Sequence, residues 1–142
     1  DGQSLADIDK ADIILVGVSR TSKTPTCIYL ANRGYKAANI PLVLDVPPPR
    51  ELDNAKRPLI VGLIASPERI VQVRRNRLLA LNERDDTTYA DAERVREECT
   101  AARRLYEAKG WPVIDVSRRS IEETAAAVLN LLSQRAGTEI PK

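Results

Sequence analysis

The chain has 142 residues, enough for one domain with a buried core. Apolar residues make up 43% and charged residues 30%, which is typical of a globular protein and excludes a disordered segment. The formal net charge of +2 argues against a dedicated nucleic-acid binder. No apolar run approaches the roughly 20 residues of a membrane-spanning helix, so we expect no membrane partner.

Histidine and methionine are both absent, and cysteine is scarce. Without histidine, the chain can build no Ser-His-Asp or Cys-His catalytic group and no histidine metal site. The two cysteines, Cys27 and Cys99, have no metal-ligand spacing, and there is no signal peptide. We therefore expect a cytoplasmic protein with reduced, buried thiols. Methionine is also absent, so we expect the chain to be part of a longer protein.

The first half of the chain predicts two strands around one helix. The continuous apolar run 12–18 is typical of a strand that is buried on both faces of a parallel sheet. A helix is predicted over 25–33, and a second strand over 40–46, with Pro41 indicating a late start or an edge position. The prolines at 47–49 end that strand.

The second half predicts two more strands and three helices. Ser66, followed by a proline and a glutamate, is a strong helix start, and Ser120 with Glu123 forms a capping box. The predicted elements are a strand over 59–65, a helix over 66–81, a helix over 88–109, a strand over 112–116 and a helix from Ser120 to about 135.

Strands alternate with helices along the whole chain. This alternation predicts the α/β class, with a mainly parallel sheet of about four to five strands between two helical layers. We place one domain over 12–135, with a lead-in over 1–11 and a flexible tail over 136–142.

The loop after the first predicted strand carries the strongest functional signal. It reads Gly17-Val-Ser-Arg-Thr-Ser-Lys-Thr24 and matches G-x-x-x-x-G-K-[ST], except that Ser22 replaces the second glycine. A loop of this kind at a helix N-terminus directs several N–H groups at a phosphate. Lys23 would reach the terminal phosphates, and the Thr24 hydroxyl would lie where Mg²⁺ binds. The predicted nucleotide-binding residues are Gly17, Val18, Ser19, Arg20, Thr21, Ser22, Lys23 and Thr24.

The serine in this loop departs from the motif. If its position needs a positive φ, Ser22 is strained there, because serine has a Cβ and glycine does not. A serine- and threonine-rich turn that only caps the helix remains the alternative to phosphate binding.

Phosphoryl transfer also needs an acid that binds metal or orients the nucleophile. Two apolar runs end in aspartate, at Asp45 and Asp115, where the carboxyl ends of parallel strands would lie. We predict Asp45 as the catalytic base or the acid on the Mg²⁺ side, and Asp115 as a second metal candidate. The alternatives are a turn aspartate before the prolines and a residue that helps to cap the last helix.

Two arginines of the predicted helix over 66–81 fall on its apolar side. Arg74 and Arg77 project among aliphatic residues, where an unpaired charge is costly. A bound phosphate would supply the partner, and arginine offers bidentate geometry. The alternatives are side chains that extend their charged ends to solvent, or ion pairs with the next helix.

Three stretches together resemble one known family. The loop and helix over 17–31, the segment 66–78 and the segment 112–125 are similar to the pyruvate, phosphate dikinase / phosphoenolpyruvate synthase regulatory proteins. The resemblance covers nearly the whole chain and implies a P-loop-kinase-like fold. Members are about twice this length, so the chain resembles their C-terminal, nucleotide-binding half.

The resemblance implies a bifunctional enzyme. Such proteins phosphorylate a threonine of the dikinase or synthase with ADP as the donor, and remove it by phosphorolysis with inorganic phosphate, releasing pyrophosphate. It implies ADP and inorganic phosphate as ligands and places the family's nucleotide site at residues 17–24. From the loop motif and the needs of phosphoryl transfer we also expect Mg²⁺, with Lys23, Arg20 and Asp45 as the catalytic residues. The segment 112–125 is closer to the dikinase branch, and a homodimer is compatible with the resemblance.

Three other functions stay open. The chain could be an ATP-dependent small-molecule kinase, which a preference for ATP would support. It could be a nucleotide-sensing module that never transfers phosphate. A nucleic-acid binder that uses the arginine-rich helix would show steep salt dependence.

Overall fold

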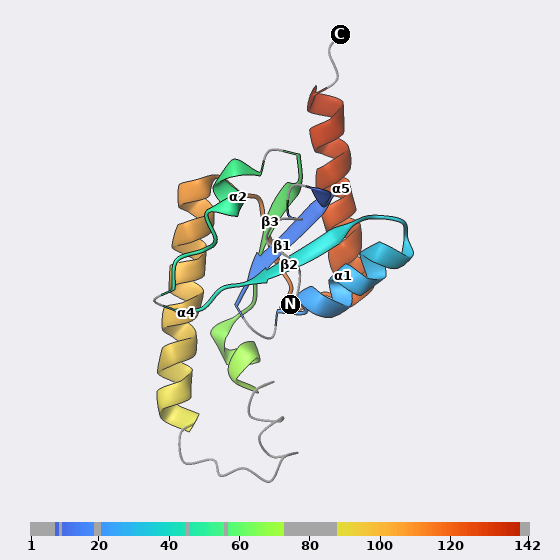
Figure 1. Ribbon diagram of the computed structural model, residues 1–142. Coiled ribbons are helices and arrows are strands. Elements are labelled where there is room, and N and C mark those ends of the chain that lie inside the picture. Colours follow the sequence, from blue (N-terminus) through green and yellow to red (C-terminus); the bar gives the residue numbers. More distant parts are fainter. Residues whose placement is uncertain are drawn as a thin grey trace.

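The computed structural model describes residues 8, 10–18, 21–44, 46–55, 57–72 and 88–139. Four strands form one parallel sheet in the order β2-β1-β3-β4, with helices on both faces (Figure 1). The strands are β1 (Ile13–Gly17), β2 (Ala37–Pro41), β3 (Leu59–Ile64) and β4 (Val113–Asp115). The helices are α1 (Lys23–Asn32), α2 (Glu51–Asn54), α4 (Thr88–Lys109) and α5 (Ile121–Glu139). The predicted α/β class is confirmed, and the layers are consistent with a P-loop-kinase-like fold.

The strand β1 is buried along its whole length because both of its faces are covered. Ile14 and Val16 pack into the cluster beneath α4, whereas Ile13 and Leu15 pack into the cluster beneath α1 and α5. Figure 1 shows α4 on one side of the sheet and α1 with α5 on the other. Alternate residues of a strand point to opposite faces, so a strand between two helical layers must be apolar at every position.

The second strand was predicted at the wrong place. The structure has β2 over Ala37–Pro41, whereas the prediction was 40–46. Its pairing runs from Ile13 with Ala37 to Gly17 with Pro41, so the ladder stops where β1 ends. Residues beyond Pro41 run past the end of their neighbouring strand. The apolar residues there line a pocket instead.

Helix boundaries follow local signals in most places. Helix α1 begins at Lys23, two residues before the predicted start, and the short α2 was not predicted. Residues 67–72 are helical, and the Arg69 N–H donates to Ser66 Oγ at 3.2 Å, as expected of an N-cap. The rest of that predicted helix, 73–81, lies outside the described residues.

The last helix begins with the predicted capping box. The Glu123 N–H donates to Ser120 Oγ at 3.1 Å, and the Ser120 N–H donates to Glu123 Oε1 at 3.0 Å. The predicted domain boundary at 135 falls inside this helix, which runs to Glu139. At the other end, Ile8 and Ala11 of the predicted lead-in belong to the buried cluster beneath α4.

Tyr106 of α4 makes both packing contacts and hydrogen bonds to the sheet. The ring of Tyr106 covers Gly62 of β3, and its hydroxyl lies 3.0 Å from the Val16 carbonyl oxygen and 2.9 Å from the Leu63 carbonyl oxygen. Burial raises the pKa of Tyr106, so the hydroxyl stays a donor. None of the helices that the structure describes is long and apolar enough to cross a membrane.

Candidate active site

The loop with the P-loop-like sequence lies at the carboxyl edge of the sheet, between β1 and α1. The chain leaves β1 toward the face covered by α1, whereas the helices after β3 reach the face covered by α4 (Figure 1). Neighbouring parallel strands whose connections diverge in this way form the switch point where open α/β sheets bind ligands. The predicted loop is therefore at the position where this class of fold places its ligand.

Gly17 is required where β1 enters the loop. A Cβ at this residue would lie 2.8 Å from Thr21 Oγ1 and 3.2 Å from the Leu63 carbonyl oxygen. Both distances are shorter than ordinary van der Waals contact, so a side chain here would push the loop away from β3. The first glycine of the motif thus permits the loop to fold back over the strand end.

Ser22 adopts the strained conformation that its place in the motif suggests. Its φ of 63° and ψ of 28° lie in the left-handed region, and it is the one non-glycine residue with positive φ in the part of the chain that the structure describes. It is the N-cap of α1, yet its side chain makes no capping hydrogen bond. The structure therefore gives this position the backbone of the motif glycine.

The ammonium group of Lys23 lies inside the loop. This side chain is only 7% exposed, and its Nζ donates to the Val18 carbonyl oxygen at 2.7 Å. Thr21 Oγ1 donates to the same oxygen at 2.8 Å. A positive charge is thus held where the loop curves around the helix N-terminus, which is where a phosphate would be bound.

The start of α1 favours an anion. Its first turn contains no acidic residue, so nothing offsets the positive end of the helix dipole. Thr24 is exposed in that turn, and its hydroxyl oxygen is a ligand type that Mg²⁺ accepts beside substrate phosphates. These residues fit a Mg²⁺–nucleotide complex. The described residues contain no group of three acidic or cysteine side chains that could hold a metal ion by themselves.

Asp115 lies at the same edge of the sheet but on the other side of β3. It is paired with Ile64 in register, so it is two strand spacings, about 10 Å, from β1. Its Oδ1 accepts the Ser117 N–H at 2.9 Å, and hydrogen bonds from Ser117 hold its pKa below the usual range. Ser117 Oγ in turn accepts the Ser66 N–H at 2.7 Å. These bonds shape the turn before α5, whose capping box is made by Ser120 and Glu123. The role of Asp115 as a metal candidate stays a prediction.

Five predicted site residues lie outside the described residues, and their roles stay predictions. They are Ser19, Arg20, Asp45, Arg74 and Arg77.

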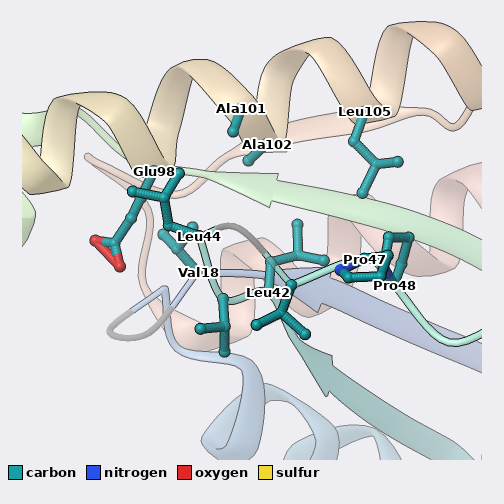
Figure 2. Close-up of a pocket in the computed structure, with 11 residues that line it drawn as sticks. Val18, Leu42, Leu44, Pro47, Pro48, Glu98, Ala101, Ala102 and Leu105 are labelled. Carbon is teal, nitrogen blue, oxygen red and sulfur yellow. The ribbon is translucent and has the colours of Figure 1, made fainter.

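A pocket beside the loop was not predicted. It has a volume of about 270 Å³ and lies between the segment after β2 and helix α4 (Figure 2). Its described lining residues are Val18, Leu42, Val43, Leu44, Val46, Pro47, Pro48, Glu98, Ala101, Ala102 and Leu105. The signal was the group of aliphatic residues Leu42, Val43, Leu44 and Val46, which the sequence pattern predicted to be part of a strand.

Cys27 and Cys99 are buried thiols that form no disulfide, as predicted. Burial raises the pKa of the Cys27 thiol to about 11, against a smaller lowering by a hydrogen bond from Asn39. At neutral pH the thiol is therefore protonated and a poor nucleophile.

The chain is similar to known proteins over most of its length. The model of the kinase/pyrophosphorylase family matches residues 1–129. A Caulobacter vibrioides protein is 64% identical over 137 residues, which are 96% of this chain and 44% of that protein. A Rhizorhabdus wittichii protein is 60% identical over 142 residues, which are 100% of this chain and 52% of that protein.

A third similar protein, from Novosphingobium aromaticivorans, is 62% identical over 135 residues, 95% of this chain and 48% of that protein. All three are provisionally named pyruvate, phosphate dikinase regulatory proteins. The chain spans about half the length of these curated relatives. Because the family model covers most of the chain, the chain belongs to the kinase/pyrophosphorylase family.

Proposed function

We propose that this chain is the nucleotide-binding part of a bifunctional regulator of pyruvate, phosphate dikinase. In this proposal it phosphorylates a threonine of the dikinase with ADP and removes the phosphate by phosphorolysis. The names of the relatives support the target, and the family description supports both directions of phosphoryl transfer. The observation that carries the proposal is the buried Lys23 ammonium inside a P-loop-like turn.

In the first reaction, the threonine oxygen attacks the β-phosphorus of ADP. The bond from that phosphorus to the bridging oxygen breaks, AMP leaves, and a base takes the hydroxyl proton. Lys23 and the loop N–H groups would hold the β-phosphate. Mg²⁺ held beside Thr24 would supply charge neutralisation. Arg20 would stabilise the transferring group, and Asp45 would serve as the base.

In the second reaction, which removes the phosphate, an oxygen of inorganic phosphate attacks the phosphorus of phosphothreonine. The bond from phosphorus to the threonine oxygen breaks, pyrophosphate forms, and the threonine oxygen regains a proton. Both reactions transfer one phosphoryl group between a threonine and a phosphate, so one anion site serves both.

Calorimetric titration tests nucleotide binding. We expect Mg·ADP to bind the chain, and Lys23→Ala to weaken this binding about 10- to 100-fold, because a charge-assisted hydrogen bond contributes roughly 1.5–3 kcal/mol. Lys36→Ala is the matched control, since Lys36 is an exposed lysine at the opposite edge of the sheet. Equal affinity of the wild type and Lys23→Ala would contradict the proposed site.

Transfer is measured on the full-length protein with the dikinase as acceptor. We expect a phosphorylated dikinase and AMP from ADP, and pyrophosphate when inorganic phosphate is then added. A stronger reaction with ATP would favour an ordinary kinase. Nucleotide binding without transfer would favour a sensing module.

A further inference from the structure

Apart from Val18 of the loop, the described residues that line the pocket between α4 and the chain after β2 have no role in the proposed function. We call this cavity the α4 pocket, with the lining residues given above. In Figure 2, Leu42, Leu44 and the two prolines face the side of α4 that carries Ala102 and Leu105. Because Val18 belongs to both, the pocket borders the loop between β1 and α1.

Two hydrogen bonds to backbone carbonyl oxygens join the α4 pocket to the loop. Val18 lines the pocket with its side chain, while its carbonyl oxygen accepts the hydrogen bond from Lys23 Nζ at 2.7 Å. The Leu42 N–H donates to the Gly17 carbonyl oxygen at 2.9 Å, which fixes the start of the lining segment beside the loop. A molecule in the pocket would therefore contact Val18, whose carbonyl oxygen binds the ammonium group of Lys23.

The pocket and the helix that would bind phosphate lie on opposite faces of the sheet. Helix α1 packs on the face with Ile13 and Leu15, whereas α4 packs on the face with Ile14 and Val16. In phosphoryl transfer, the attacking and leaving oxygens lie roughly in line on opposite sides of the phosphorus. If the nucleotide is held at α1, the α4 face is the side from which an acceptor would approach.

The chemistry of the lining does not suit a nucleotide. Of its described residues, Glu98 alone is charged, and its carboxylate lies at the end of the pocket beside Leu44 (Figure 2). A carboxylate repels phosphate, and the remaining side chains are aliphatic and cannot satisfy the polar edge of a base. The lining therefore favours an apolar group.

The size and the rim favour one side chain of a bound polypeptide. The volume of about 270 Å³ is below the range of roughly 300–1,000 Å³ for pockets that enclose a whole small molecule. Val43 and Val46 at the rim are 54% and 58% exposed, so apolar surface continues outside the pocket. A polypeptide can cover that rim while one of its side chains fills the pocket.

We propose that the α4 pocket binds an apolar side chain of the protein substrate, from a residue close in sequence to the phosphate acceptor. The inference rests on the proposed function, because it assumes that the acceptor is a protein. In this arrangement the pocket determines which hydroxyl reaches the phosphate, while the loop binds the donor.

Ala101→Leu is the variant that tests the pocket. Ala101 lines the pocket and is exposed, so a leucine there fills space without disturbing the buried core. Ala108→Leu is the matched control, because Ala108 is exposed on the same side of α4, two turns further on, and does not line the pocket. Equal melting temperatures of the two variants show that both fold.

The measurements are the KM for the dikinase, kcat and the Kd for Mg·ADP, on the full-length protein. We expect Ala101→Leu to raise the KM for the dikinase at least fivefold and to leave kcat and the nucleotide Kd within twofold. Ala108→Leu is expected to match the wild type. An equal KM in the two variants would overturn the inference. A nucleotide Kd that rises with the KM would overturn it as well, since the pocket would then bind the nucleoside.

Direct binding of the dikinase separates this inference from the proposed function. If the wild type transfers no phosphate, the proposed function is wrong. The Kd for the dikinase then tests whether the α4 pocket is a docking site. A Kd at least fivefold higher in Ala101→Leu than in Ala108→Leu retains the pocket as a docking site. Equal values, or no binding by the wild type, overturn it.

Discussion

Ser22 combines a side chain with a backbone conformation that suits glycine. Its φ of 63° brings the Cβ close to its own backbone, at a cost of about 1–2 kcal/mol for an L-residue. No capping hydrogen bond offsets this cost, because the side chain caps nothing. The conformation is nonetheless kept, since Lys23 next to it must enter the loop. Strain at this residue is therefore a consequence of the arrangement around the site.

Ser22→Gly is expected to stabilise the protein by about 0.5–1 kcal/mol, because the removed strain exceeds the flexibility that glycine adds to the unfolded chain. Urea unfolding measures the change as a higher midpoint with an unchanged m-value. Ser22→Ala is the control, because alanine keeps the Cβ. The strain then remains, and no gain in the free energy of unfolding is expected. Equal midpoints for the two variants would show that the residue is not strained.

At the scale of elements, the Tyr106 ring of α4 packs closely against Gly62 of β3. A Cβ on Gly62 would lie 2.6 Å from three atoms of the Tyr106 ring. The ring is fully buried, and its hydroxyl is bound between two carbonyl oxygens of the sheet, so it has no room to move. A glycine in the middle of β3 is thus explained by the close approach of a helix side chain.

Gly62→Ala is expected to lower the free energy of unfolding by about 1–3 kcal/mol, because the new methyl group overlaps the ring. Thermal or urea unfolding measures the loss. In the double variant Gly62→Ala with Tyr106→Leu, the clash is relieved, so the combined loss should be smaller than the sum of the two single losses. Additive losses would show that the ring and the glycine are not coupled.

At the scale of the whole molecule, two apolar clusters share the same strands. Residues of β1 alternate between the cluster beneath α4 and the cluster beneath α1 and α5. Neither cluster can lose its packing without exposing half of the apolar residues of β1 to water. The two helical layers therefore depend on each other through the sheet.

Unfolding is expected to be a single cooperative transition. Trp111, the one tryptophan, packs against the cluster beneath α4, with its ring centroid 6.4 Å from that of Tyr106. Its fluorescence reports on one layer, whereas far-ultraviolet circular dichroism reports on all helices. Coincident guanidinium midpoints from the two signals are expected of a two-state protein. Separate midpoints would mean that the layers unfold independently.

The sequence by itself determined the features that depend on neighbours along the chain. The buried strand at Ile13–Gly17, the loop before Lys23 and the capping box at Ser120 each follow from residues within a few positions of one another. Periodicity, capping chemistry and the loop motif are local properties, so they can be predicted without a fold. The same local reasoning predicted strain at Ser22 on the condition that its position needs a positive φ, and the structure gives it a φ of 63°.

The tertiary structure decided the features that join distant segments. The second strand ends at Pro41 because β1 ends beside it, and the described residues 42–44 and 46–48 then line the pocket beside α4. Likewise, the contact of Gly62 with Tyr106 joins residues 44 positions apart. No local pattern encodes such a pairing, since it depends on which elements pack together. The position of the loop between β1 and α1 could thus be predicted from the sequence, whereas the pocket beside it required the fold.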